Sequence, residues 1–281
     1  MRNNAPLILA FDNGGLLVNS EKAFLAANKK IFNALSQILK KYGFDSKQYT
    51  KAEFIYHNIL TSLGTKGYLR EKNIPEPLIH EIKTYRNKIF ETIISEKKEK
   101  GTWAIGDRIE QLKALKNKFK DRIKLVLVTT SSKQKIMAMH MGIIPLNLFD
   151  QYITKDDLKD PSRIKPFPDL YKLVTEKFPY AKKYLAFEDT PRGAESVINA
   201  QNNGVPYVIP NEITKNVPMP KGVNIIDFED IMSIVENELS TQNNWLKRFA
   251  AQPKKILDWI KTRFTSQMRF ILDTVKKYFK L

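Results

Sequence analysis

Short apolar runs alternate along the chain with longer segments whose apolar side chains recur every three or four residues. The runs fall at residues 6–11, 123–130, 149–153, 184–189 and 206–210, and the run at 123–130 is rich in β-branched residues. Segments with helical periodicity follow at 132–141, 168–178 and 192–203. Because buried strands alternate with helices, the pattern predicts an α/β protein with a doubly wound, mainly parallel sheet.

A block of helices interrupts this alternation after the first strand. Helical periodicity is expected at 19–41, 51–63, 76–95 and 107–118, with Phe24, Ile31, Leu35 and Leu39 forming the apolar face of the first segment. Gly43, residues 64–67 and residues 75–77 supply turn signals, and a charged break is expected at 97–101. The predicted domains are a core of residues 1–20 and 101–240, an inserted helical domain of 21–100, and a tail of 241–281.

Polar side chains follow three of the predicted strands. Asp12 comes after the first strand and precedes Gly14 and Gly15, Thr129 closes the second, and Glu188-Asp189 end the strand at 184–189. The carboxyl ends of parallel strands share one edge, where open sheets bind ligands, so these groups should converge there. Carboxylate oxygens are ligands that Mg²⁺ accepts. Two alternatives stay open: a hydroxyl at a strand end can cap the next helix, and acidic residues are favoured at a helix start.

Four stretches occur in an order that resembles one known family. They are Phe-Asp12-Asn-Gly14-Gly-Leu-Leu-Val-Asn-Ser, Val-Thr129-Thr130-Ser, Lys165-Pro-Phe-Pro-Asp and Glu188-Asp189-Thr-Pro-Arg-Gly. Together they resemble the motifs of the haloacid dehalogenase (HAD)-like hydrolases, closest to the β-phosphoglucomutase-like and sugar-phosphate phosphatase branch. The resemblance implies a Rossmann-like core with an inserted α-helical cap. Residues 241–281 exceed what that fold requires and are expected to add a C-terminal helical extension.

The same resemblance assigns roles to individual residues. Asp12 corresponds to the nucleophile that takes up the phosphoryl group. Thr129, Thr130 and Lys165 correspond to phosphate-binding positions, with Thr129 and Lys165 also counted as catalytic. Asp12, Glu188 and Asp189 correspond to the Mg²⁺ ligands.

One position departs from the family pattern. The first motif usually reads Asp-x-Asp-Gly, and its second Asp is the general acid/base, but this chain has Gly14 there. In the phosphonoacetaldehyde-hydrolase branch, which also lacks that carboxylate, a cap lysine supplies an amine, and Lys47 and Lys51 are candidates for it. The resemblance implies a Mg²⁺-dependent phosphohydrolase of small phosphorylated metabolites, slowed by the missing group. The alternative is an inactive pseudoenzyme that binds phosphate or targets a membrane or partner through its tail.

Charge and composition add three expectations. The net charge is +17, and residues 241–281 hold ten Lys/Arg against two Asp, a net +8. An apolar stripe opposes basic residues in the tail, so residues 245–281 form a candidate amphipathic helix for an anionic membrane or a protein partner, the alternative being packing on the protein's own core. The sequence contains no nucleic-acid-binding motif. With no cysteine, no signal peptide and no apolar run of membrane-spanning length, we expect a cytoplasmic protein, with peripheral membrane attachment as the alternative.

Overall fold

The structure is a computed structural model that describes residues 5–61, 63–181 and 183–250. The chain divides into two compact units, residues 1–229 and residues 230–281. The first unit holds the sheet, the helical insertion and every candidate site residue.

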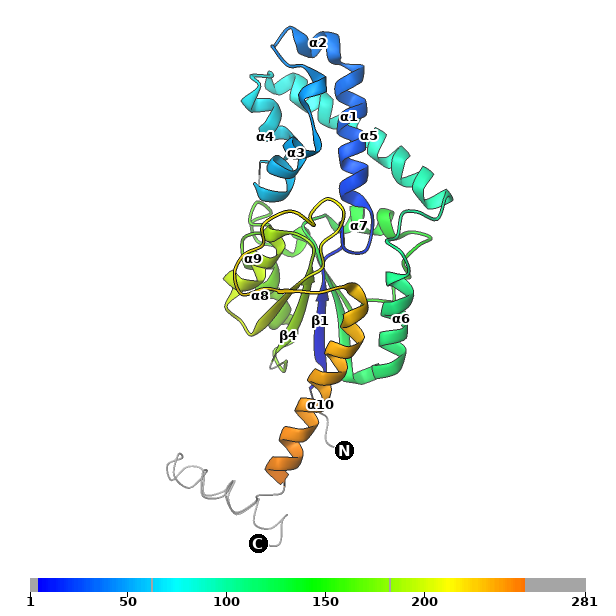
Figure 1. Cartoon of the computed structure of the whole chain (residues 1–281), viewed down its shortest axis with the longest axis vertical. Coiled ribbons are helices and arrows are strands. Elements are labelled where there is room, and N and C mark those ends of the chain that lie inside the picture. Colours follow the sequence, from blue (N-terminus) through cyan, green and yellow to red (C-terminus); the bar gives the residue numbers. More distant parts are fainter. Residues whose placement is uncertain (1–4, 62, 182, 251–281) are drawn as a thin grey trace. The chain divides into compact units, whose positions relative to one another are not determined.

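A six-stranded parallel sheet forms the centre of the first unit (Figure 1). Its strand order is β3-β2-β1-β4-β5-β6, and each neighbouring pair runs parallel. The chain builds outward from β1 to β3 and then returns to the other side of β1 for β4. Such a reversal of strand order opens a crevice at the carboxyl ends of the strands. The strands are β1 (Leu7–Phe11), β2 (Ile123–Val128), β3 (Gln151–Ile153), β4 (Tyr184–Glu188), β5 (Gly204–Val208) and β6 (Asn224–Ile225).

Helices cover the sheet because alternate strand residues point to opposite faces. On one face, Ile8 and Ala10 of β1 share a buried cluster with Tyr171 and Val174 of α8 and with Val197 of α9. In Figure 1, α6 lies on the side away from α8 and α9. These helices are α6 (Arg108–Phe119), α7 (Lys133–His140), α8 (Asp169–Lys177) and α9 (Pro191–Ala200). The predicted doubly wound α/β fold is confirmed.

Among the described residues between β1 and α6, five α-helices and a π-helical turn form the inserted helical part, here called the cap (Figure 1). Two predicted cap helices were too long. The segment expected at 19–41 breaks at Leu35, whose backbone leaves the helical region at φ −100° and ψ 15°. The segment expected at 51–63 changes from α- to π-helical hydrogen bonding at Ile55. The cap elements are α1 (Ser20–Ala34), α2 (Ser36–Lys40), α3 (Lys51–Phe54), the π turn (Ile55–Leu60), α4 (Gly64–Glu71) and α5 (Glu76–Glu99). Single 3₁₀ turns occur at Ser46–Gln48, Lys120–Arg122, Lys155–Asp157 and Phe228–Asp230.

The cap has its own apolar core, and a loop of the sheet domain enters it. Buried aromatic residues from several cap elements, Phe32 and Tyr68 among them, pack together with Ile213 and Val217 from the loop after β5. The same loop forms an ion pair from Glu212 to Lys22, with 2.5 Å between Oε2 and Nζ. The cap is therefore packed against the sheet domain through this loop.

Two chain segments connect the cap to the sheet, and they are hydrogen bonded to each other. Val18 pairs with Ala104 in an antiparallel bridge, and the Asn19 amide donates to the Trp103 carbonyl at 2.9 Å. The Asn19 side chain adds a bond to the Thr102 carbonyl at 2.9 Å. The entry and exit of the cap thus form one short two-stranded ribbon.

The second unit contains α10 (Ile231–Ala250), which runs without a break across residue 240. The apolar stripe predicted in the tail falls mainly on residues 251–281, outside the described residues. Within the described part of the chain, no helix is long and apolar enough to cross a bilayer.

Candidate active site

One cavity at the carboxyl edge of the sheet gathers every residue that the motifs single out. The cavity has a volume of about 180 Å³. It is lined by Asp12, Gly14, Thr129, Thr130, Lys165, Glu188 and Asp189, among others. Strand order explains the convergence, because β1 lies between β2 and β4. Most of these residues end or follow one of the three strands. Lys165 reaches the strand ends from a loop.

Lys165 is the centre of the polar network in this cavity. Its Nζ lies 2.5 Å from Asp12 Oδ1 and 2.6 Å from Glu188 Oε1, and it donates to the Val128 carbonyl at 2.8 Å. The Arg192 guanidinium donates to the Lys165 carbonyl and so fixes the loop that carries the lysine. Burial alone would lower the pKa of Lys165, but the two carboxylates raise it above its usual range, so the ammonium stays charged.

Three carboxylates beside Lys165 form a candidate metal site. Asp12, Glu188 and Asp189 each offer an oxygen within 4.8 Å of the others. Burial raises the pKa of Glu188 to about 7, and burial together with neighbouring acids raises the pKa of Asp189 well above its usual range. Such a set of crowded, buried oxygens fits a hard divalent cation, whose charge would relieve the repulsion.

Two glycines allow the backbone to approach these acids. Gly15 has φ +73°, and a Cβ there would lie 2.0 Å from Asp189 Oδ2. A Cβ on Gly193, near the start of α9, would lie 1.9 Å from Glu188 Oε2. Glycine is therefore needed at positions 15 and 193, because a side chain at either position would clash with a carboxylate of the site.

The two structural alternatives raised by the sequence do not describe these side chains. Ser132 caps α7 by accepting from the Lys135 amide, whereas Thr129 is buried and its hydroxyl accepts from the Ser131 amide at 3.2 Å. Thr190 caps α9 by accepting from the Gly193 amide at 3.2 Å, whereas Glu188 is the last residue of β4. Other residues therefore cap α7 and α9, and the side chains of Thr129 and Glu188 line the cavity instead.

Several residues in or beside the cavity were not singled out from the sequence. Glu21 and Lys135 line the cavity, and Asn211 donates to Asp189 Oδ2 at 2.7 Å and to the Gly15 carbonyl at 3.0 Å. Burial lowers the pKa of Lys135 to about 8. Glu21 directly follows the first motif stretch and lies in the first turn of a helix, where an acidic residue is ordinary. Asn211 directly follows the apolar run at 206–210, and this position after a predicted strand could have indicated that it lies near the site.

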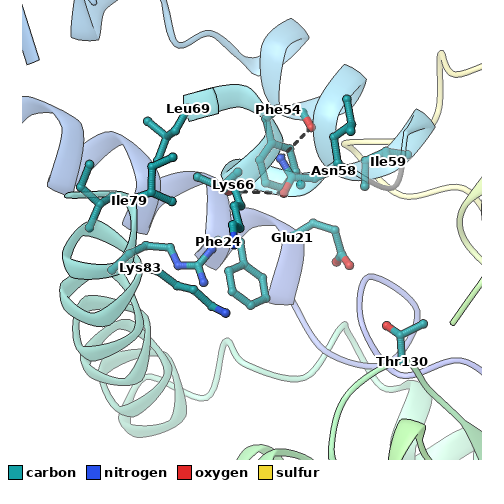
Figure 2. Close-up of a pocket in the computed structure, with 15 residues that line it drawn as sticks. Glu21, Phe24, Phe54, Asn58, Ile59, Lys66, Leu69, Ile79, Lys83 and Thr130 are labelled. Carbon is teal, nitrogen blue, oxygen red and sulfur yellow. Dashed lines mark hydrogen bonds between the residues drawn. The ribbon is translucent and has the colours of Figure 1, made fainter. Parts of the chain in front are cut away.

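A second cavity of about 380 Å³ extends from the site into the cap (Figure 2). Glu21, Phe24 and Thr130 line both cavities, so the two adjoin. The cap cavity combines apolar walls with the cationic side chains of Lys66, Lys83 and Arg86. The candidate cap amines lie elsewhere: Lys47 and Lys51 line neither cavity, and Lys51 donates to the Glu212 carbonyl at 2.7 Å.

The comparisons agree with the fold and the motifs. Over residues 9–209 the sequence matches the haloacid dehalogenase-like hydrolases, and the chain belongs to that family. A search of curated proteins gives no match.

Solved structures of the same fold include three with high coverage. CbbY from Rhodobacter sphaeroides, in complex with phosphate, has 20% identity and a TM-score of 0.57, covering 80% of this chain and 95% of its own. A predicted phosphoglycolate phosphatase from Haemophilus somnus has 16% identity and a TM-score of 0.60, with coverages of 83% and 99%. A HAD-superfamily hydrolase of subfamily IA from Geobacter sulfurreducens has 16% identity and a TM-score of 0.54, with coverages of 83% and 98%.

Proposed function

We propose that the protein is a Mg²⁺-dependent phosphohydrolase of small phosphorylated metabolites that forms an aspartyl-phosphate at Asp12. The observation that carries this proposal is the bridge from Lys165 Nζ to Asp12 and Glu188, at 2.5 and 2.6 Å, inside the cavity that Thr129 also lines. A buried ammonium beside a strand-end carboxylate holds that carboxylate in place and balances the negative charge of an incoming phosphoryl group.

The motif residues in the cavity, together with Arg192, then have defined parts in the reaction. Asp12 uses one carboxylate oxygen to attack phosphorus, while Lys165, Thr129 and Thr130 bind the phosphoryl oxygens. Asp12, Glu188 and Asp189 would hold Mg²⁺, and the ion, when bound, neutralises part of the phosphoryl charge. Arg192 keeps the Lys165 loop against the site through its bond to the Lys165 carbonyl.

The cap cavity supports a small, polar substrate. Its apolar walls and its Lys66, Lys83 and Arg86 side chains suit a compact carbon skeleton with further anionic or polar groups. CbbY from Rhodobacter sphaeroides, a protein of the same fold, has been solved with xylulose-(1,5)-bisphosphate. A sugar phosphate is accordingly the substrate class to test first.

Gly14 favours a second candidate function, a phosphate-binding protein without turnover. A glycine cannot protonate a leaving oxygen or activate water, and loss of general acid/base assistance typically costs about 10²–10⁴-fold in rate. That corresponds to roughly 3–5 kcal/mol at 1.36 kcal/mol per decade. Electrostatic stabilisation by the remaining groups is often the larger contribution and does not require residue 14.

A panel of phosphate esters, assayed with and without Mg²⁺, separates the two functions. We expect Mg²⁺-dependent release of phosphate from sugar phosphates, abolished in Asp12→Asn, which keeps the side-chain size but removes the nucleophile. The matched control is Asp121→Asn, a change of an exposed aspartate on the 3₁₀ turn after α6. Phosphate binding by calorimetry without turnover of any ester would select the pseudoenzyme.

A further inference from the structure

The space beside Gly14 is occupied. A Cβ built on Gly14 would lie 2.5 Å from Ser20 Oγ and 3.1 Å from Glu21 Oε1. A Cβ on Gly15 would lie 2.5 Å from Glu21 Oε2. The carboxyl group of Glu21 therefore covers the turn from which the family's second aspartate would otherwise extend.

Local structure holds Glu21 in this position. Glu21 is the second residue of α1, and the Ser20 hydroxyl donates to its Oε1 at 3.1 Å. Asn19, the residue before α1, is hydrogen bonded to Trp103 and Thr102 in the ribbon, so the start of α1 is tied to the sheet domain. Figure 2 shows the Glu21 carboxyl group extending from α1 toward the side of the site where Thr130 lies.

Glu21 is not one of the three candidate metal ligands. Four described carboxylates line the catalytic cavity, and three of them, Asp12, Glu188 and Asp189, form the candidate metal cluster. Glu21 is the fourth and lies outside that cluster. The nearby His140 is engaged with Asn13, with 2.6 Å between its Nε2 and the Asn13 Oδ1.

Given the proposed function, on which this inference rests, we propose that Glu21 performs the proton transfers normally assigned to the residue that Gly14 replaces. The general acid/base has thus moved from the turn after β1 to the first turn of the cap helix α1. The chain would retain a complete set of groups for both half-reactions, and turnover would not require a second aspartate in the first motif.

The two half-reactions balance with Glu21 as the proton carrier. In the first, an Asp12 oxygen bonds to phosphorus, the phosphorus–oxygen bond to the leaving alcohol breaks, and the Glu21 carboxyl proton passes to the leaving oxygen. In the second, the Glu21 carboxylate accepts a proton from water as the water oxygen bonds to phosphorus and the bond from phosphorus to Asp12 breaks. The products are the alcohol and phosphate, and Glu21 ends protonated as it began.

The electrostatic environment suits a carboxyl that begins the reaction protonated. Burial, assisted by the nearby Asp12, raises the pKa of Glu21 to about 8. Asp12 and Asp189 face it from the ends of β1 and β4 and disfavour its charge, whereas Lys135 faces it from α7 and favours it. Its place beside Gly14 and its buried surroundings both favour a carboxyl that carries a proton.

Glu21→Gln tests the inference because it keeps shape and hydrogen bonding but removes the transferable proton. With an alkyl phosphate, whose leaving oxygen needs a proton, we expect turnover to fall by about 10²–10⁴-fold. With p-nitrophenyl phosphate, whose leaving group needs none, Asp12 should still be phosphorylated. The aspartyl-phosphate should then accumulate, visible by intact-protein mass spectrometry, because water lacks its base.

Controls make each outcome decisive. Glu81→Gln, an exposed change on α5, should match the wild type. Glu21→Asp, which keeps a carboxyl group on a shorter side chain, should retain more alkyl-phosphate turnover than Glu21→Gln. Wild-type turnover with no accumulation in Glu21→Gln would overturn the role of Glu21 alone. A wild type that hydrolyses no ester would overturn the proposed function as well.

Discussion

Lys165 is buried among three acceptors, and this arrangement sets the electrostatics of the site. Its ammonium contacts Asp12, Glu188 and the Val128 carbonyl, while Asp189 lies close by without such an ion pair. One positive charge thus offsets the three carboxylates only in part. Buried like charges that are not balanced favour proton uptake or metal binding.

The pH dependence of stability follows from this imbalance. The folded-state pKa of Glu21 is raised to about 8 and that of Glu188 to about 7, each from a usual value near 4.5. Between those values the folded state binds more protons than the unfolded state, so the free energy of unfolding falls as pH rises. Burial lowers the pKa of His140 from 6.5 to about 4. This residue makes the free energy of unfolding rise with pH, but only below about pH 6.5.

We therefore expect the melting temperature of metal-free protein to fall between pH 6.5 and 8 and to recover on addition of Mg²⁺. Calorimetry and thermal shift in EDTA and in Mg²⁺ would measure both effects. Asp189→Asn should bind Mg²⁺ weakly and lose the recovery, and Asp121→Asn should keep it. Equal Mg²⁺ responses of the Asp189→Asn variant and the wild type would remove the metal site from the proposal.

The sequence could predict some of these residues and not others, for a physical reason. Asp12, Thr129 and Glu188 close or end apolar runs, and parallel strands bring such positions together whatever the loops do. Glu21 reaches the site by the path of the chain through the turn at Gly14 and Gly15, which periodicity does not encode. A helix-start glutamate has an ordinary explanation, so its carboxyl attracted no assignment.

At the scale of the elements, the approach of α9 to β4 determines the position of one candidate metal ligand. Gly193 allows the first turn of α9 to lie against the Glu188 carboxylate, which also accepts from the Tyr171 hydroxyl and Lys165. The helix could not lie this close with a larger residue there. The site and the helix packing therefore depend on the same glycine.

Gly193→Ala should displace Glu188 or α9, since the new Cβ would lie 1.9 Å from Glu188 Oε2. We expect a loss of about 1–3 kcal/mol in the free energy of unfolding, the usual range for overpacking, together with weakened Mg²⁺ binding. Denaturant unfolding and calorimetry would measure the two effects. Ile198→Ala, at a partly exposed position of the same helix, should change Mg²⁺ affinity little; unaltered stability and affinity in Gly193→Ala would contradict the account.

Element boundaries were predicted less well than element types. Helices were extended across Leu35 and Ile55 because the apolar period continues there, although the hydrogen bonding changes. The charged segment 97–101 was expected as a break, yet α5 continues to Glu99, since charged residues are tolerated at an exposed helix end. The strand β6 was missed because it has two exposed residues and no apolar run.

For the whole molecule, the basic tail remains a prediction from the sequence. Its net +8 charge and apolar stripe predict attachment to an anionic surface or partner through residues 245–281. The test is co-sedimentation with vesicles containing anionic lipid, comparing the full chain with a chain ending at residue 250, which retains all of α10.

Binding by the full chain should weaken with added salt and in Lys276→Gln/Lys277→Gln, because apolar burial is assisted by screened attraction. The shortened chain should stay folded and lose binding, and vesicles of neutral lipid are the control. Unfolding of the shortened chain would instead indicate that the stripe packs on the protein itself.

The ribbon formed by Val18, Asn19, Trp103 and Ala104 has a mechanical consequence. Both chain segments that join the cap to the sheet domain lie in this ribbon, so an opening of the cap would pivot there and displacement would grow with distance from it. The end of the cap that carries α2 lies far from the sheet in Figure 1 and would move furthest in such an opening. Glu21, two residues beyond Asn19, lies near the fulcrum and would barely move. The cap could therefore open for the substrate while Glu21 keeps its position in the site.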